Sequence, residues 1–362
     1  MINLKILRDR IKYKLLKMDL RNGFKNLATI LTIFAVFSAV FLGCKPGTAV
    51  IEKPTVTEEV TEKVTETATE ETTIEEPTTE VEEEEVLEYP VTVLDDTGYQ
   101  VTLAKEPDKI VSLAPGNTEI LFALGLGEKI VGVDSYSNYP EEVESIEKIG
   151  DAFNLNMEKI IELEPDLILT LKGMEEAVKE FENFGIAVYT LDANNIENVL
   201  EDIEEIGQLT DRVERAEELT SEMQEKIDEI KTLVADVSDE DKPKVFYMFG
   251  NEPIWSTGSG TFINDLIELA KGINIVAADG LEGWLVYSLE KLIEHNPDVI
   301  IAPKFLAPTP ETITADERFS SIKAVLENRV VVVDDDPVSR IGPRIVEGFL
   351  QIAQALYPDI EF

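Results

Sequence analysis

The stretch DRVERAEELTSEMQEKIDEIKTLVAD (residues 211–236) predicts one long, uninterrupted helix. Its apolar residues recur at spacings of three and four and form one stripe: Val213, Ala216, Leu219, Met223, Ile227, Ile230 and Val234. The remaining positions are polar or charged, without Gly or Pro, and Thr210 or Asp211 can cap the start. At about 1.5 Å per residue, such a helix reaches roughly 35–40 Å, the width of a domain. We therefore expect it to bridge two separate bodies.

An internal repeat flanks this helix. NMEKIIELEPDLIL (residues 156–169) and SLEKLIEHNPDVII (residues 288–301) are identical at seven of 14 positions, at an offset of 132 residues. Each copy predicts a polar cap, a short amphipathic helix, a Pro that ends it and an apolar strand. The repeat therefore indicates two related lobes, one on each side of the long helix.

Alternating helices and apolar strands continue through both halves and predict the α/β class. We expect two Rossmann-like lobes with mainly parallel sheets, joined by a single long helix, and a ligand cleft between the lobes at the carboxyl ends of the strands. The predicted divisions are an N-terminal lobe (89–194), bridging helices (195–242) and a C-terminal lobe (243–362). Asn117 is expected to cap a helix, and residues 250–255 and 334–344 are expected to be loops.

The chain is strongly acidic, with a net charge of −41 over 362 residues. Residues 1–43 carry eight Lys or Arg against two Asp, so the acidic groups lie beyond them. Such a surface is a poor partner for nucleic acid or an anionic membrane face, and it suits a basic protein partner or a neutral or cationic ligand. Most of these charges are also explained by a solvated surface. We expect a monomer that binds no nucleic acid.

Residues 1–43 resemble a signal peptide or membrane segment: a basic leader precedes an uncharged apolar run, and Met1 or Met18 can be the start. The run FLGC (41–44) is similar to a lipobox, which would make Cys44 a lipidation site; an uncleaved anchor is the alternative. Residues 44–88 are rich in Thr and Glu, and we expect a disordered tether whose threonines can carry sugars. Both alternatives place the folded part at the outer face of the cytoplasmic membrane, held there by an N-terminal anchor.

Composition argues against an enzyme. One His and one Cys exclude a His cluster, an internal disulfide and a Cys-based metal site, and no phosphate-binding Gly-rich loop or Gly-x-Ser-x-Gly elbow is present. His295 replaces Leu163 of the other repeat copy at a helix end, so we expect a structural role for it. The sequence therefore predicts no catalytic residues, no metal site and no cofactor.

Aromatic residues gather in segments expected to be strand-end loops of the two lobes: Tyr136, Tyr139, Phe153, Trp255, Trp284 and Tyr287. Aromatic side chains at such an edge suit a large, flat, partly apolar ligand, although we expect Tyr139 and Tyr287 to fill the core instead. Arg340 follows the last strand, where it can bind a ligand oxygen or pair with residues 334–336.

The repeat places Glu158 and Glu290 at equivalent positions, each in the first turn of a helix. The helix dipole favours an acidic residue there. The alternative is a matched pair of acidic side chains, one per lobe, that docks on a partner with two basic pockets and contributes orientation and association rate.

Three segments resemble the substrate-binding proteins of ABC importers for cobalamin and ferric siderophores: SLAPGNTEILFALG (112–125), VGVDSYSNYP (131–140) and EPDLI (164–168). The similarity runs from about residue 91 to the end. It implies two α/β lobes bridged by one long helix, a lipid anchor in cells without an outer membrane, and delivery of ligand to a permease dimer. Cobalamin binders are the most similar because they share the Ser-Tyr-Ser-x-Tyr-Pro loop and a Trp before the second repeat.

The resemblance implies ligand contacts for a set of residues in both lobes: Gly116, Tyr136, Phe153, Leu171, Trp255, Trp284, Asp336 and Arg340. It makes Glu158 and Glu290 the permease-docking carboxylates. Phe153 and Leu171 are departures, because cobalamin binders have Trp residues near these positions. The expected ligand is a corrinoid, followed by a ferric siderophore or haem. Siderophores usually require several cleft cations, and only Arg340, Arg344 and Lys172 are candidates. Alternatives of another class are a cell-surface structural module and a chelatase-like enzyme.

Overall fold

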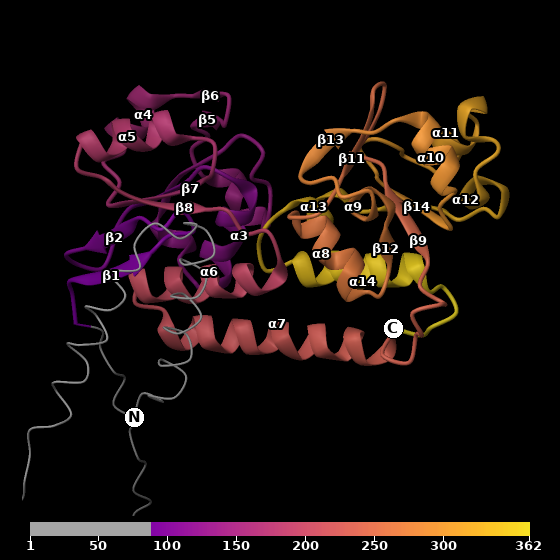
Figure 1. The fold of residues 1–362 in the computed structure, drawn as a ribbon. Coiled ribbons are helices and arrows are strands. Elements are labelled where there is room, and N and C mark those ends of the chain that lie inside the picture. Colours follow the sequence, from indigo (N-terminus) through magenta and orange to yellow (C-terminus); the bar gives the residue numbers. More distant parts are fainter. Residues whose placement is uncertain (1–87) are drawn as a thin grey trace, which may run out of the picture. The chain divides into compact units, whose positions relative to one another are not determined.

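Two four-stranded parallel sheets, one per lobe, form the framework of residues 88–362, the part of the chain that the computed structural model describes (Figure 1). These residues belong to one compact unit. The signal-like leader, Cys44 and the Thr/Glu-rich segment before Glu88 lie outside the described residues. The predicted α/β class with two lobes, mainly parallel sheets and one long connecting helix is confirmed.

The first lobe has the strand order β4-β3-β7-β8. Its parallel strands are β3 (Ile110–Ser112), β4 (Ile130–Val133), β7 (Leu167–Leu171) and β8 (Ala187–Leu191). Its helices are α3 (Pro115–Ala123), α4 (Met157–Glu162), α5 (Glu175–Asn183), η1 (Gly127–Lys129) and η2 (Glu141–Ser145). Two antiparallel pairs complete it: β1 (Val91–Leu94) with β2 (Gln100–Leu103), and β5 (Gly150–Asp151) with β6 (Asn154–Leu155).

The second lobe has the order β12-β9-β14-β15. These strands are β9 (Lys244–Tyr247), β12 (Ile273–Asn274), β14 (Val299–Pro303) and β15 (Val330–Val333). An antiparallel sheet is formed by β10 (Gly250–Asn251), β11 (Ile254–Thr257) and β13 (Trp284–Val286). The helices are α8 (Phe262–Leu269), α9 (Ile275–Ala278), α10 (Leu289–His295), α11 (Glu311–Thr314), η3 (Glu317–Phe319), α12 (Lys323–Leu326), α13 (Asp335–Ser339) and α14 (Ile345–Leu356).

Alternation along the central strands divides the core into layers. In β7, Leu167 and Leu169 belong to a cluster that extends toward the bridging helices, whereas Ile168 belongs to a second cluster with α4 and α5. In β14, Ile301 joins the first cluster and Ile300 a third one. Because successive strand side chains point to opposite faces, both faces of each sheet are covered, as in parallel sheets generally.

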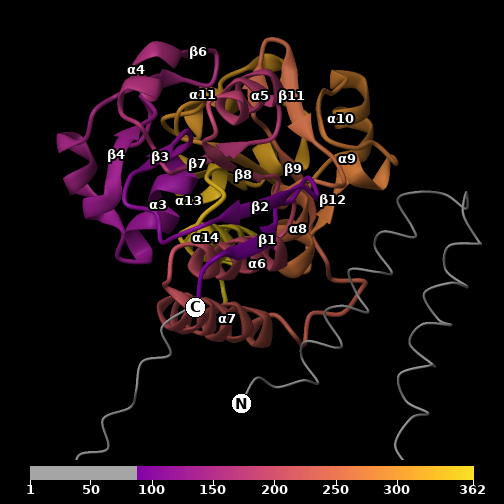
Figure 2. The ribbon, with the colours of Figure 1, turned by 90° about the vertical axis from the view of Figure 1, so that its left-hand side faces the viewer.

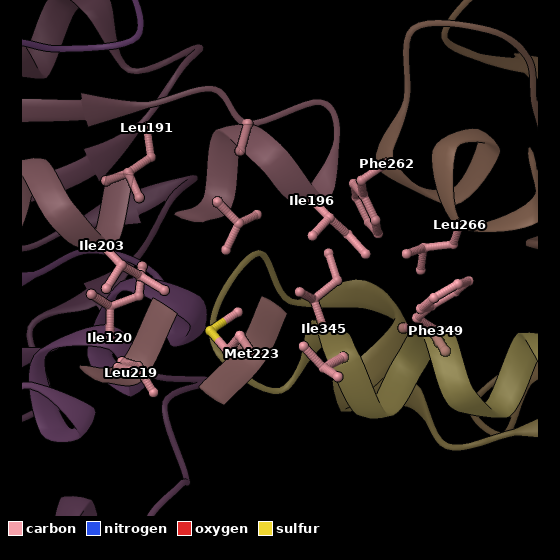
Figure 3. Packing of buried hydrophobic residues seen from close by; sticks show 14 of the residues in the cluster. Ile120, Leu191, Ile196, Ile203, Leu219, Met223, Phe262, Leu266, Ile345 and Phe349 are labelled. Carbon is pink, nitrogen blue, oxygen red and sulfur yellow. The ribbon is translucent and has the colours of Figure 1, made fainter. Parts of the chain in front are cut away.

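The bridging helix is α7 (Val213–Leu233), preceded by α6 (Ile196–Leu209). Figure 1 shows α7 running beneath both lobes, where it contacts α6 and α14. Five residues of its apolar stripe are buried in the first cluster: Ala216, Leu219, Met223, Ile227 and Ile230. The cluster also takes Ile203 from α6, Ile120 from the first lobe, and Ile345 and Phe349 from the second (Figure 3). One continuous apolar core therefore passes from lobe to lobe behind the sheets, which restricts hinge motion.

Several local expectations are wrong. Asn117 does not cap α3, which begins at Pro115, because proline is well suited to the first helical position. Neither Thr210 nor Asp211 caps α7: Thr210 donates to the Ile206 carbonyl and ends α6, and Asp211 makes the turn with φ of 56°. Residues 250–255 are mostly strand, and residues 335–339 form α13 rather than a loop.

Asp202 is a buried carboxyl on α6, the helix that the β1–β2 hairpin contacts through β1 (Figure 2). The Tyr189 hydroxyl is 2.8 Å from both Asp202 Oδ1 and Glu205 Oε2, and the other Asp202 oxygen has no partner among the described residues. Burial, followed by repulsion from Asp96, raises the pKa of Asp202 well above its usual value. The folded protein therefore holds this carboxyl in its protonated form more strongly than the unfolded chain does.

The contribution of Asp202 to stability should accordingly fall as the pH rises. A carboxyl whose folded pKa is raised contributes its full stabilisation below the unfolded pKa, near 4, and loses it as the pH rises through the folded pKa. We expect Asp202→Asn, which keeps an acceptor for Tyr189, to gain stability relative to the unaltered protein between pH 4 and pH 8. Urea unfolding at both pH values tests this, with the exposed Asp359→Asn as control. A stability difference that does not change with pH would contradict it.

Candidate functional site

A cavity of about 360 Å³ lies where the carboxyl ends of the strands of the two lobes meet. The first lobe contributes the start of α3 and the ends of β4 and β7, and the second contributes α13 and the turn that follows it. The lining residues are Ala114, Pro115, Gly116, Asn117, Tyr136, Leu171, Asp336, Ser339, Arg340 and Ile341. Five of the eight predicted ligand contacts are thus brought together: Gly116, Tyr136, Leu171, Asp336 and Arg340. Phe153, Trp255 and Trp284 are not among the lining residues.

Gly116 lies at a close contact between the backbones of the two lobes. A Cβ atom there would stand 2.2 Å from the carbonyl oxygen of Ile341, and the Gly116 oxygen lies 3.0 Å from the equivalent Cβ position on Gly342. Two glycines that face each other therefore allow the backbone of α3 to contact the turn after α13. Ligand contact by Gly116 remains a prediction. The structure also shows a steric reason for glycine at this position, because a side chain would clash with the Ile341 carbonyl of the other lobe.

The charges around the cavity pair across the two lobes. Glu119 of α3 is buried, and its carboxylate accepts hydrogen bonds from Arg340 at 2.9 Å and from Arg344 at 2.9 and 2.8 Å. Arg340 also pairs with Asp336 at 2.8 Å, as the sequence allowed, whereas Asp334 pairs with Lys304. Each arginine has at least one carboxylate partner, so the charge at this wall is neutralised within the protein.

Glu119 was missed at the level of sequence. Its signal was an acidic residue in a helix whose other positions from Ile120 to Leu124 are apolar. An unpaired carboxylate is rarely buried, so such a residue implies a cationic partner.

Tyr136 is held by a buried polar network at the end of β4. Asp134 accepts a hydrogen bond from the backbone N–H of Tyr136 at 2.9 Å and another from the Ser137 hydroxyl. The Ser137 hydroxyl also lies 2.8 Å from that of Thr118, which links the loop to α3. The loop is therefore fixed at its base while the Tyr136 side chain remains 65% exposed at the cavity.

Of the two tyrosines expected to fill the core, Tyr287 is buried and Tyr139 is not. Tyr287 is buried and packs on Phe246 at 5.6 Å between ring centroids, as predicted. Tyr139 is not a core residue: it is exposed, and the Arg344 guanidinium lies 4.2 Å from its ring centroid. This cation–π contact places Tyr139 beside the charged wall of the cavity.

Both tryptophans lie on strands rather than in loops. Trp255 belongs to β11 and Trp284 begins β13, where it pairs with Thr257. The Trp284 ring packs near Tyr247, Phe249 and Phe262, with centroid distances of 6.5, 5.0 and 6.1 Å. The sequence predicts loops here because β11 and β13 are short and lie near glycines, and their pairing with each other joins segments about 30 residues apart.

Phe153, the third predicted ligand contact outside the cavity, lies in the turn between β5 and β6 and is 93% exposed. The turn is closed by Asp151, whose carboxylate accepts from the Phe153 N–H at 2.8 Å. Ligand contact by Phe153 remains a prediction.

Glu158 and Glu290 occupy matching places on α4 and α10. Each is exposed in the first turn of its helix. Each helix has a polar side chain at its cap, with Asn156 accepting from Lys159 N at 3.1 Å and Ser288 from Lys291 N at 3.4 Å. The sequence repeat is therefore also a repeat of local structure.

His295 has the structural contact expected of it. Its Nε2 lies 2.8 Å from Asp279, which also accepts from Tyr287 and Lys291, and these partners lower the pKa of Asp279 to about 2. Within residues 88–362, no group of three or more His, Cys, Asp or Glu side chains is arranged to hold a metal ion. In the same part of the chain, no helix has both the length and the apolarity needed to cross a bilayer.

Comparison with known proteins gives a consistent result. A family model for periplasmic binding proteins matches residues 110–337. YvrC of Bacillus subtilis (strain 168), an uncharacterized ABC transporter substrate-binding lipoprotein, is 37% identical over 277 residues, which cover 75% of this chain and 87% of YvrC. The vitamin B12-binding protein of Pectobacterium carotovorum is 27% identical over 252 residues, covering 69% of this chain and 88% of that protein.

A solved structure adds the fold. The crystal structure of a possible iron-binding (periplasmic solute-binding) protein from Staphylococcus epidermidis is 37% identical, with a TM-score of 0.62, and covers 70% of this chain and 100% of that one. The chain therefore belongs to the periplasmic binding protein family, as a substrate-binding protein of an ABC transporter that works with a permease and a small-molecule ligand, and not as an enzyme.

Proposed function

We propose that the protein is the extracytoplasmic, lipid-anchored binding protein of an ABC importer that binds a corrinoid, cobalamin, between its lobes and delivers it to the permease. The observation that carries this proposal is the cavity between the strand ends of both lobes, with Tyr136 at its wall. Its only charged lining residues, Asp336 and Arg340, neutralise each other at 2.8 Å. Such a site suits a ligand with little net charge, part of which the cavity would hold.

The ion pairs weigh against a polyanionic ligand. Catecholate and carboxylate siderophores carry several negative charges and need unpaired cations to bind them. Arg340 and Arg344 are both paired with Glu119, and Lys172 is paired with Asp192 at 2.5 Å. A corrinoid, whose edge is rich in neutral amides, does not require these cations. A ferric chelate or haem is the second candidate, supported by the possible iron-binding relative from Staphylococcus epidermidis.

We also propose how the protein is held at the membrane and how it docks on the permease. Lipidation of Cys44 would hold the protein at the outer face of the cytoplasmic membrane, in keeping with the name of YvrC as a lipoprotein. Residues 44–88 would be the tether, followed by the lobe 89–194, the bridge 195–242 and the lobe 243–362. Glu158 and Glu290 would dock in basic pockets of a permease dimer.

Titration calorimetry of the purified full-length protein tests the ligand. We expect cyanocobalamin to bind with a Kd of about 1 µM or below, and Tyr136→Ala, which removes the aromatic ring at the cavity wall, to weaken it about tenfold through loss of aromatic contact area. Leu326→Ala, which removes another exposed apolar side chain, is the control. Tight binding of a ferric catecholate together with no heat from cyanocobalamin would transfer the assignment to the second candidate.

A further inference from the structure

The cavity uses the strand ends of the two lobes unequally. In the first lobe, three adjacent strands contribute: Tyr136 follows β4, Gly116 follows β3 and Leu171 ends β7. In the second lobe, only the end of β15 contributes, through α13 and the turn after it. The neighbouring strands of that sheet, β14 and β9, also end at this edge, because all of these strands are parallel.

Exposed aromatic rings occupy those two unused strand ends. Phe249 stands two residues beyond β9, and Phe305 stands two residues beyond β14. The Phe249 ring contacts two other rings. Its centroid lies 5.4 Å from that of Phe305 and 5.0 Å from that of Trp284. We call Phe249, Trp284 and Phe305 the aromatic patch. All three side chains are partly exposed, at 37%, 42% and 57%.

One hydrogen bond joins the aromatic patch to the helix that lines the cavity. The backbone N–H of Phe305 donates to Asp335 Oδ1 at 2.8 Å, and Asp335 begins α13. The same short helix contains Asp336 and Ser339, which line the cavity. Along the sheet, the order β9-β14-β15 therefore places Phe249, Phe305 and the cavity-lining helix in succession.

The cation next to Phe305 in the chain is paired. Lys304, its neighbour, is ion-paired with Asp334, and Asp335 is engaged with the Phe305 backbone. The rings are inclined to one another, at 77° for Phe249 and Phe305 and 53° for Phe249 and Trp284. An apolar aromatic surface of this kind packs on the face or edge of another ring system and gives little attraction to a free carboxylate or a bare metal ion.

We propose that the aromatic patch extends the ligand site beyond the cavity and that Phe305 is a specificity residue for ligands with a large planar ring system, the tetrapyrrole class. This inference rests on the proposed function and adds to it a residue that the sequence did not single out. The ligand would occupy the cavity with one part and lay its ring edge across Phe305. Because Phe305 is more than half exposed before any ligand arrives, its contacts would be gained on binding.

The test compares two phenylalanines of equal exposure. Phe305 and Phe184 are each 57% exposed, and Phe184 lies at the end of α5 on the first lobe. With the full-length protein, we expect Phe305→Ala to weaken cyanocobalamin or hemin binding about fivefold to twentyfold, and Phe184→Ala to change it less than twofold. Phe305→Leu keeps apolar volume without the ring and should give an intermediate loss, while the melting temperature of each variant reports folding.

Each outcome decides the inference. Equal affinities for Phe305→Ala and Phe184→Ala, with normal binding by the unaltered protein, would overturn the role of Phe305 and leave the proposed function standing. Failure of the unaltered protein to bind either tetrapyrrole would overturn both. If Phe305→Leu binds as well as the unaltered protein, the ring is not what recognises the ligand, and the class assignment is wrong.

Discussion

Glu119→Ala should lower the free energy of unfolding by about 3–5 kcal/mol, because it removes a buried carboxylate and leaves two partly buried arginines without this partner. The Glu119 side chain is 2% exposed, and those of Arg340 and Arg344 are 11% and 18% exposed. Asp336 lies 2.8 Å from Arg340 and 3.5 Å from Arg344, so a single remaining carboxylate would have to serve both. Chemical denaturation of the full-length protein measures the loss.

The matched control is a solvent-exposed ion pair on the surface of the protein. Lys105 and Asp108 are 2.8 Å apart, but their side chains are 63% and 73% exposed. Solvent screens such a pair, so Asp108→Ala should cost no more than about 1 kcal/mol. Glu119→Gln keeps the shape and should fall between the two variants. If Glu119→Ala is no more destabilising than Asp108→Ala, the pairing of the two lobes through Glu119 contributes nothing measurable.

The ion pairs of Glu119 with Arg340 and Arg344 could not be predicted from the sequence. The apolar stripe of residues 211–236, the repeat, and the alternation of helices with apolar strands predicted the bridging helix, the two lobes and the strand ends that Tyr136 and Arg340 follow. The family resemblance implied Leu171. Glu119 meets its partners 221 and 225 residues later in the chain. No local pattern specifies which cation reaches a given carboxylate across a cleft, so this contact needed the three-dimensional structure.

The errors in the second lobe have a related cause. Trp255 and Trp284 lie on strands of four and three residues, stabilised by pairing between β11 and β13 rather than by their own sequence. Helix α13 begins in a run of three Asp residues followed by Pro337, which is typical of a turn. Its first residue is tied to Phe305, 30 positions away, and Phe305 itself followed an apolar strand without any motif to mark it.

Charge reversal at both Glu158 and Glu290 should abolish ligand delivery while leaving ligand affinity unchanged. The two glutamates are exposed at equivalent first turns of α4 and α10, one on each lobe, and neither lines the cavity. If they dock in two basic pockets of the permease, each lysine would meet a like charge, and juxtaposed like charges cost several kcal/mol. Uptake of labelled ligand by cells, or by vesicles holding the permease, should fall more than tenfold.

The repeat supplies the control that separates docking from a general charge effect. Glu162 and Glu294 are also equivalent, exposed and on the same two helices, one turn further along. The pair Glu162→Lys and Glu294→Lys changes the net charge by the same amount, and it even improves the charge at the helix ends, where cations are favoured. If docking is local to the first turns, this pair should support uptake within about threefold of the unaltered protein. Equal losses from both pairs would mean that the permease responds to the overall acidity of the surface, and that Glu158 and Glu290 are first-turn residues favoured only by the helix dipole.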